Sequence, residues 1–167
     1  MTHRDRKIVI ARLKAKPLLA GQLVSALVFT ALAVGQAAPV AADGAAAMLR
    51  AILFGDAIAS AAMLAALFAF WTCLRLWRQR DAWIFHDGAR LYRGGALSWP
   101  LALVRDVVID RGELGIVSLR LVVDDDSEVT RELVKLYLLA DRPEVVRDAV
   151  MFAAARAGGV AVSASVH

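Results

Sequence analysis

The sequence predicts an α+β membrane protein, in which a two-helix transmembrane hairpin precedes a mainly antiparallel β domain that ends in a helix. Three observations lead to this fold class. Two long apolar runs lie near the N-terminus, at 17–38 and 51–77. Short alternating runs bounded by turn residues follow them. One amphipathic stretch then closes the chain at 142–157.

The two apolar runs have the length of membrane spans. The first, 17–38, contains no charged residue and would extend about 33 Å as a helix. The second, 51–77, is interrupted only by Asp56 and Arg75. Backbone groups in hydrocarbon must find partners within their own segment, so both runs are expected to be helices. The basic segment and first apolar run also suit a cleaved secretory signal, although the length of that run favours an uncleaved helix.

The positive charge is concentrated before the first span. The chain has a net charge of +4; residues 1–16 hold six basic and one acidic residue, whereas residues 78–167 hold twelve basic and thirteen acidic ones. A nucleic-acid-binding protein would need a basic stripe on its folded domain, so this class is excluded. Basic residues expected to meet anionic lipids at the membrane surface are Arg4, Arg6, Lys7, Arg12, Lys14, Lys16, Arg78 and Arg80.

The same bias predicts the orientation of the hairpin. The loop at 39–50 contributes only Arg50, so both termini of this multi-pass protein are expected in the cytoplasm, with the helices in the bacterial inner membrane. Trp71, Trp77 and Trp83 cluster where the second helix would leave the bilayer. They are expected to form the interfacial aromatic belt of this end.

Asp56 is an acidic residue inside the second apolar run. Intramembrane carboxylates often serve ion or proton pathways, which would make Asp56 a pore-lining residue of an oligomeric channel or transporter. No second acid or histidine lies deeper in either run to form a relay. The favoured interpretation therefore places Asp56 near the outer interface, with pore lining as the alternative.

The region 78–160 is predicted to be one cytoplasmic β domain. Expected strands are 82–86, 89–93, 96–99, 103–110, 114–123 and 129–139, with tight turns at Asp87-Gly88 and Gly94-Gly95. Asp141 and Glu144 have capping-box spacing at the start of the helix 142–157, which Gly158-Gly159 is expected to end. The organisation is thus a basic arm at 1–16, a hairpin at 17–77, the β domain at 78–160, and a loose tail at 161–167.

Within this domain the pattern is a strand, a turn with glycine, a second strand, and a tryptophan before another hydrophobic segment. It is carried by Trp83–Tyr92, Ala96–Pro100 and Val104–Val107. It resembles bacterial pleckstrin-homology-like (PH-like) domains, and two preceding spans resemble the short two-span members of that family. The resemblance implies a PH-like barrel or sandwich closed by the C-terminal helix, serving as a scaffold. The first turn lacks the basic residues with which eukaryotic relatives grip inositol phosphates.

No residue pattern indicates catalysis or a cofactor. The chain contains neither a G-x-x-x-x-G-K-[ST] phosphate loop nor a G-x-S-x-G elbow, and its single cysteine and three dispersed histidines do not form a metal motif. A non-enzymatic protein is therefore predicted, whose β domain binds a protein partner or a second copy, or assembles a membrane complex. The alternatives are a channel or transporter subunit using Asp56 and a membrane-tethered enzyme whose site is assembled from distant residues.

Overall fold

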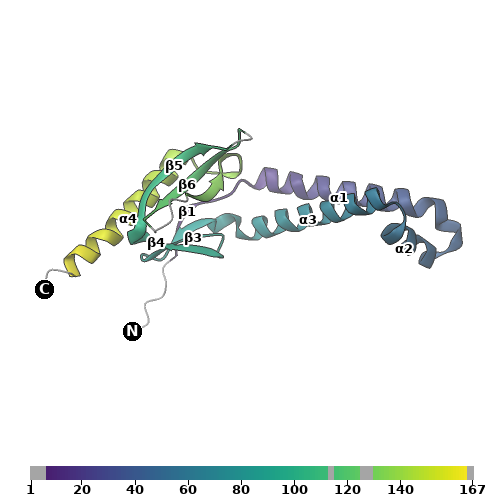
Figure 1. The fold of residues 1–167 in the computed structure, drawn as a ribbon, viewed down its shortest axis with the longest axis horizontal. Helices are drawn as coiled ribbons and strands as arrows, with labels where there is room; N and C mark the ends of the chain where they lie inside the picture. Colours follow the sequence, from purple (N-terminus) through teal and green to yellow (C-terminus); the bar gives the residue numbers. More distant parts are fainter. Residues whose placement is uncertain (1–6, 113–114, 125–129, 165–167) are drawn as a thin grey trace. The chain divides into compact units, whose positions relative to one another are not determined.

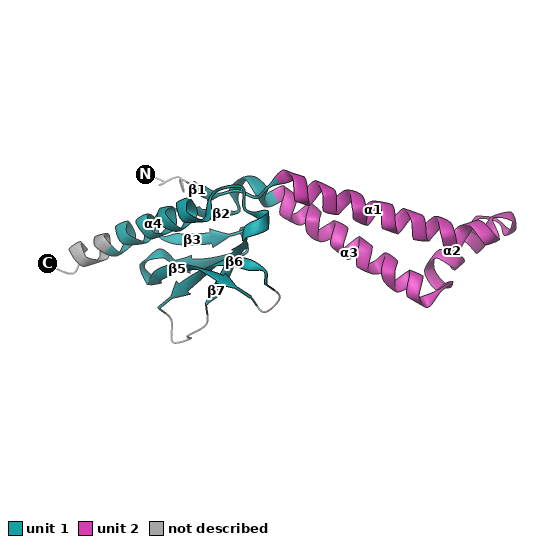
Figure 2. Ribbon diagram, turned by 90° about the horizontal axis from the view of Figure 1, so that it is seen from above, with its two compact units in different colours: residues 1–14, 79–167 teal, residues 15–78 magenta. Residues whose placement is uncertain are grey.

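The computed structural model describes residues 7–112, 115–124 and 130–164, with side chains through residue 158. The chain divides into two compact units (Figures 1 and 2). Unit 1 consists of residues 1–14 and 79–167, and unit 2 of residues 15–78. The β-rich unit is therefore assembled from two segments that the apolar helices separate in the sequence.

Unit 2, which the structure describes in full, is helical. Its elements are α1 (Ala15–Ala37), the short 3-10 helix η1 (Ala38–Asp43), α2 (Ala45–Phe54) and α3 (Ala57–Gln79, whose last residue belongs to unit 1). The run predicted as one helix over 51–77 is divided at Gly55 and Asp56, and α2 begins within the expected loop. The reason is local: the Asp56 carboxylate accepts the N–H of Ala59 at 2.8 Å, which starts a new helix.

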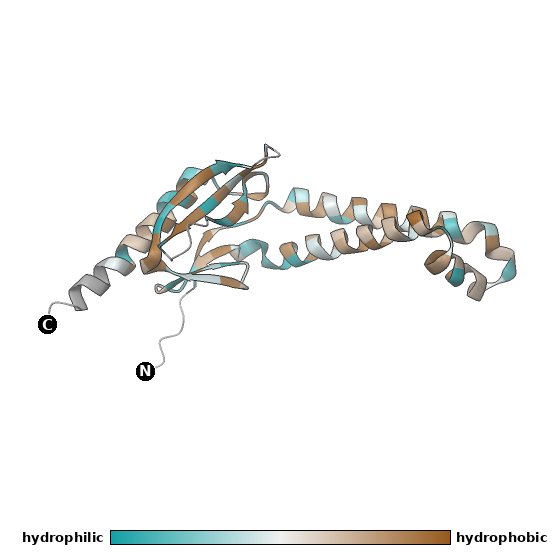
Figure 3. Cartoon of the chain, in the orientation of Figure 1, coloured by the Kyte–Doolittle hydropathy of each residue, from teal (hydrophilic) through white to brown (hydrophobic). Residues whose placement is uncertain are grey.

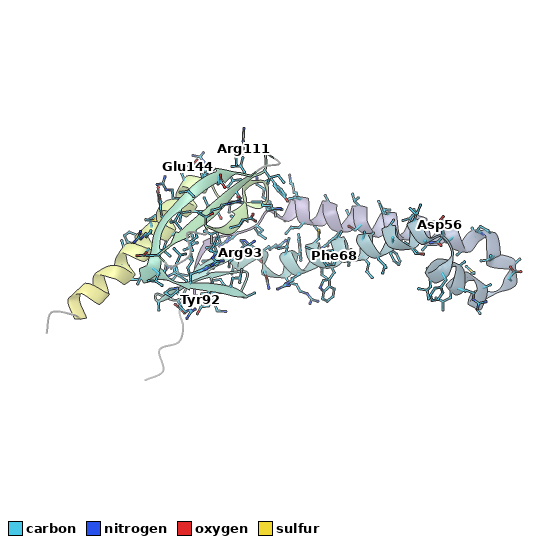
Figure 4. All side chains as sticks on the ribbon, viewed as in Figure 1. Asp56, Phe68, Tyr92, Arg93, Arg111 and Glu144 are labelled. Carbon is cyan, nitrogen blue, oxygen red and sulfur yellow. The ribbon has the colours of Figure 1, made fainter. Side chains whose placement is uncertain are left out.

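The apolar helices have exposed rather than buried surfaces. Two helical stretches among the described residues, Ala15–Asp43 and Ala57–Ala82, are long and apolar enough to cross a membrane. Only 11% of the most apolar window of each is buried, whereas the core helix of a soluble protein would be mostly covered. Phe68 on α3 is 73% exposed, and brown apolar residues recur along both helices (Figures 3 and 4). These helices could therefore span a membrane, as their length and composition predict.

A glycine brings α1 and α3 together. A Cβ atom at Gly21 would lie 2.7 Å from the Sγ of Cys73, closer than non-bonded atoms approach. Ser25, one turn further along α1, is also buried. Small residues at this position let two helices pack closely, as they do at helix contacts in membranes.

The first sheet of unit 1 is antiparallel and has the order β1-β2-β3-β4. Its strands are β1 (Ile8–Ala11), β2 (Ile84–His86), β3 (Arg90–Arg93) and β4 (Leu97–Pro100). The last three correspond to predicted strands. The sequence predicts no strand at β1, which lies in the expected basic arm; in the structure Val9 pairs with Phe85. Only this distant pairing gives the short run Ile8–Ile10 a strand partner.

The second sheet is also antiparallel and has the order β5-β6-β7, formed by β5 (Val104–Arg111), β6 (Val117–Val123) and β7 (Arg131–Lys135). The strand predicted over 129–139 ends at Lys135, where the 3-10 turn η4 (Leu136–Leu138) begins. Parts of the predicted strands and turn at 113–114 and 125–129 lie outside the described residues.

The prediction was a barrel or sandwich closed by the C-terminal helix; a closed barrel is not present among the described residues, where the two sheets share no strand ladder. Pro100 ends β4, and the 3-10 turn η3 (Leu101–Leu103) separates it from β5. The N–H of Leu101 still donates to the carbonyl oxygen of Ala89 at 2.9 Å, and the chain leaves the first sheet in η3. The α+β class is confirmed in its coarser form: two apolar helices, two antiparallel sheets and a C-terminal helix.

The C-terminal helix α4 (Pro143–Ala164) packs against β5, η3 and β1. The predicted capping role of Asp141 is not observed, because its carboxylate accepts the backbone N–H of Arg12 at 3.0 Å instead. The helix also continues past Gly158-Gly159. Glycine lowers helix propensity by about 1 kcal/mol but does not by itself end a helix. The predicted tail is helical to residue 164, and 165–167 lie outside the described residues.

Trp83 joins the two sheets in the core of unit 1. It follows the 3-10 turn η2 (Arg80–Ala82) and is 9% exposed. Its indole Nε1–H donates to the carbonyl oxygen of Leu133 in β7 at 3.2 Å. Arg93 lies over the indole ring and pairs with Glu132 at 3.7 Å. Burial lowers the pKa of Arg93, and Glu132 opposes that shift. Completely buried aliphatic side chains around this point include Ile84, Leu91, Val107, Leu119, Leu121 and Leu133.

Candidate functional site: an apolar groove beside strand β1

Unit 1 contains an apolar groove of about 710 Å³. Three successive residues of β1 form one side, and five residues of α4 form the other. His86, Gly88 and Ala89, at the connection from β2 to β3, and Ala102 of η3 complete the lining. Only His86 and Arg156 among these twelve residues carry titratable side chains. Ligand pockets typically have this size and this mainly apolar character, with few polar groups.

The α4 side of the groove borders the core face of that helix and shares the buried Ala153 with it. The residues are spaced by three or four positions and so share one face: Ala149, Phe152, Ala153, Arg156 and Ala157. Val146 and Val150, which face the core, are fully buried. Phe152 is 65% exposed, and Arg156 lies over its ring at 5.6 Å. A helix that has covered its core face thus presents further apolar surface.

Hydrogen bonds of Asp87 shape the turn at the groove's end. One carboxylate oxygen accepts the N–H groups of Ala89 and Arg90, and the other accepts the Tyr92 hydroxyl at 2.8 Å. Burial raises the pKa of Asp87, but these hydrogen bonds outweigh it and the net shift is downward. This geometry realises the predicted Asp87-Gly88 turn and places His86 and Ala89 beside β1.

His86 presents a neutral imidazole to the groove. Its Nδ1 accepts the N–H of Gly88 at 3.2 Å, so the proton of the neutral ring is on Nε2. Burial lowers the pKa of His86 below its ordinary value of 6.5, and the negative charge of Asp87 only partly opposes this. Near neutral pH the ring can therefore donate one hydrogen bond from Nε2 without carrying a charge.

The lowered pKa of His86 predicts a pH dependence of stability. Between pH 6.5 and the lower pKa of the folded state, the unfolded chain binds a proton more readily than the folded chain. The free energy of unfolding therefore decreases as the pH is lowered through this range. His86→Asn keeps an acceptor near Gly88 but does not titrate. Hydrogen exchange of the unit 1 amides at pH 8 and pH 5 is expected to show that acid lowers the free energy of unfolding more in the wild type than in H86N. Equal losses would contradict this assignment.

The structure distributes the predicted membrane-surface residues over different surroundings. Arg4 and Arg6 lie outside the described residues. Lys7 is exposed, with its Nζ 5.2 Å from the centre of the Phe85 ring. Arg12 and Lys14 follow β1, and their backbone groups form hydrogen bonds. Lys16 lies in α1 and Arg78 in α3. Arg80 pairs with Asp81 at 3.4 Å. Contact of these groups with lipid stays a prediction.

The three predicted interfacial tryptophans have different environments. Trp71 is 61% exposed on α3, Trp77 is less exposed on the same helix, and Trp83 is buried in unit 1. The Trp83 indole is committed to Leu133, so it is not available to a lipid headgroup layer. Because Trp83 directly follows a predicted span, the sequence placed it in the interfacial aromatic belt. In the structure, sheet residues that are distant in sequence bury it.

Asp56 has a structural role in unit 2. Besides capping α3, its own N–H donates to the Oε1 of Gln36 at 3.0 Å, which ties the start of α3 to the end of α1. Asp56 is exposed at the start of α3, and its placement near the outer interface stays a prediction. Lining of a channel by Asp56 stays an untested alternative.

The residues of the groove carry no strong signal in the sequence. Ile8–Ile10 read as part of the basic arm, and the alanines of α4 read as ordinary helix formers. The width of the apolar side of the helix predicted at 142–157, which includes Ala149, Phe152 and Ala153, was the one available hint. Among the described residues, no three histidine, cysteine, aspartate or glutamate side chains lie close enough to hold a metal ion.

The sheets, the C-terminal helix and the groove give the frame for comparison with known proteins. No protein-family model matches the chain, and neither a curated protein nor a solved structure is significantly similar to it.

Proposed function

We propose that this chain is a non-enzymatic membrane protein whose unit 1 is a protein-interaction module, with the groove between β1 and α4 as its docking site. The observation that carries the proposal is the open apolar lining of the groove, in which Ile8 and Phe152 are 48% and 65% exposed. Exposed apolar patches beside polar surface commonly mark binding sites. The scarcity of titratable groups in the lining favours binding over catalysis.

The proposal places α1 and α3 across the bacterial inner membrane, with both termini in the cytoplasm. Support comes from the apolar, exposed surfaces of the two helices and from the excess of Lys and Arg before α1 and after α3. On this placement the anchor holds the interaction module at the cytoplasmic face. A protein partner would then be recruited to, or assembled at, the membrane.

We further suggest that unit 1 is an open variant of a PH-like domain. Two antiparallel sheets followed by a C-terminal helix are the features in common with that fold. PH-like domains serve as scaffolds, which agrees with an interaction role. The missing ladder between the sheets is the feature in which this chain departs from a closed barrel.

Selection from a peptide library tests the docking site. The full-length chain in nanodiscs would be used to select phage that display random eight-residue peptides. The wild type is expected to enrich a set of peptides, and Ala102→Trp, which fills the groove from η3, is expected to weaken their binding at least about tenfold, because apolar contact area is lost to the new ring.

Ala96→Trp is the matched control, since Ala96 is also an exposed alanine in a connection of unit 1 but does not line the groove. It should bind the selected peptides as the wild type does. Absence of any enrichment, or equal binding by a folded Ala102→Trp variant, would refute the docking site.

A further inference from the structure

The outer edge of the β1 segment is paired along only part of its length. The N–H of Lys14 donates to Leu138, and Arg12 accepts from the N–H of Ala140, so residues 12–14 pair with 138–140 on that edge. The N–H of Arg12 is satisfied by the carboxylate of Asp141. Pro143 then begins α4, and the covering segment leaves the strand. Pairing on this edge therefore stops where Ile8–Ile10 begin.

The groove lies along the part of the edge that remains. β1 is the end strand of its sheet, and no described strand pairs with its outer side. Ile8, Val9 and Ile10 of this edge all line the groove, together with His86 of the neighbouring strand β2. A segment bound in the groove would therefore lie beside the open edge. Proteins usually protect exposed edges with charge, proline or a covering element, and Ile8–Ile10 contain neither charge nor proline.

Among the twelve lining residues Arg156 carries the one formal charge, and the Asp87 carboxylate at the groove's end is engaged by Ala89, Arg90 and Tyr92. Arg156 is exposed, and its guanidinium lies over the Phe152 ring; no described carboxylate forms an ion pair with it. Lys7 precedes the open edge. The groove-lining part of α4, residues 149–157, contains no acidic residue, and none lines the groove elsewhere. A ligand that offers a carboxylate is therefore complementary to this site.

We propose that the groove takes an extended protein segment that adds a strand to the open edge of β1, with apolar side chains against α4 and an acidic side chain against Arg156. This inference rests on the proposed docking function. Main-chain hydrogen bonds to the edge would hold the segment, and alternate side chains would enter the groove, which is the general mode of strand addition.

Charge argues against a second copy of β1 as the occupant. Residues 7–11 of a second copy contain no carboxylate that could pair with Arg156. An acidic segment of a different protein supplies that carboxylate and gains an ion pair with Arg156.

The selected peptides provide the test of charge. Peptides enriched on the wild-type chain in nanodiscs are expected to alternate apolar residues and to carry Asp or Glu. Arg156→Glu should weaken their binding at least about tenfold, as loss of a charge-assisted hydrogen bond predicts. Arg142→Glu, an exposed arginine that does not line the groove, is the matched control and should leave binding unchanged. Enriched peptides without acidic residues, or binding insensitive to Arg156→Glu, would overturn the inference.

Backbone pairing is tested by N-methylation. The tightest peptide would be synthesised with one methyl group at each amide in turn. Alternate positions are expected to lose at least about tenfold in affinity and the positions between them to change little, because only every second N–H faces the edge. Uniform losses or no losses would reject strand addition while leaving the docking site itself intact.

Two other occupants give distinct results. A lipid or fatty acid in the groove would be detected as a bound molecule by native mass spectrometry. Peptides would then bind only after this molecule is removed. A second copy would give a dimer in nanodiscs that the Ala102→Trp variant does not form. Either result would overturn the inference, and a complete failure to enrich peptides would instead refute the proposed function on which it rests.

Discussion

Replacing Trp83 with alanine is expected to lower the free energy of unfolding of unit 1 by about 3–5 kcal/mol. The indole is 9% exposed and donates a hydrogen bond to Leu133, so the change leaves a cavity between the sheets and a carbonyl oxygen without its partner. Arg93 loses the ring over which it lies. Hydrogen exchange of the amides of β2 and β7, followed by mass spectrometry in nanodiscs, measures the loss.

Trp71→Ala is the matched control for this prediction. Trp71 is 61% exposed on α3, so its removal leaves no cavity in unit 1. Exchange of the β2 and β7 amides is expected to remain as in the wild type. If Trp71→Ala destabilised unit 1 as much as Trp83→Ala, the role given to Trp83 in joining the sheets would be wrong.

Replacing Leu27 with arginine is expected to impair insertion of α1 into a membrane by about 3 kcal/mol, the cost of a cation near the centre of a spanning helix. Leu27 lies near the middle of α1 and is 68% exposed, so neither a protein partner nor a cavity of unit 2 is available to the charge. A translocon insertion assay, with a glycosylation acceptor in the α1–α2 connection, measures the inserted fraction.

Ala38→Arg provides the comparison, because Ala38 is exposed directly after α1 and a long side chain there can reach water. Its insertion should stay close to that of the wild type. Replacing an exposed leucine of a water-soluble protein with arginine would change the free energy of unfolding by about 0.5 kcal/mol or less. Equal behaviour of Leu27→Arg and the wild type in both insertion and stability would therefore contradict the transmembrane role of α1.

Local sequence signals predicted the elements whose own hydrophobic pattern or turn residues indicate their structure. The uncharged run before Pro39 predicted α1, and Asp87-Gly88 predicted the turn that separates β2 from β3. Alternation predicted β5 and β6, which are long enough for period two to be visible. The division of the second apolar run at Asp56 was missed, because a single capping residue is a weak signal within a continuous apolar stretch.

Pairing between distant residues produced the largest departures from prediction. Ile8–Ala11 became β1 only through Phe85, far along the chain, and Trp83 became a core residue only through Leu133. Asp141 met Arg12 instead of its own helix. The contacts of β1 with Phe85 and of Arg12 with Asp141 join segments that the apolar helices separate, and Trp83 and Leu133 lie 50 positions apart in the sequence. No local pattern records such a pair.

The sequence by itself determined the two apolar helices, the β-rich character of the remainder and its C-terminal helix, because hydrophobic periodicity and turn residues act over a few neighbouring positions. Tertiary structure alone decided that the N-terminal segment becomes an edge strand and that α4 leaves an apolar groove beside it. The physical reason is that a free strand edge and an uncovered helix face arise from which distant segments pair and where that pairing stops.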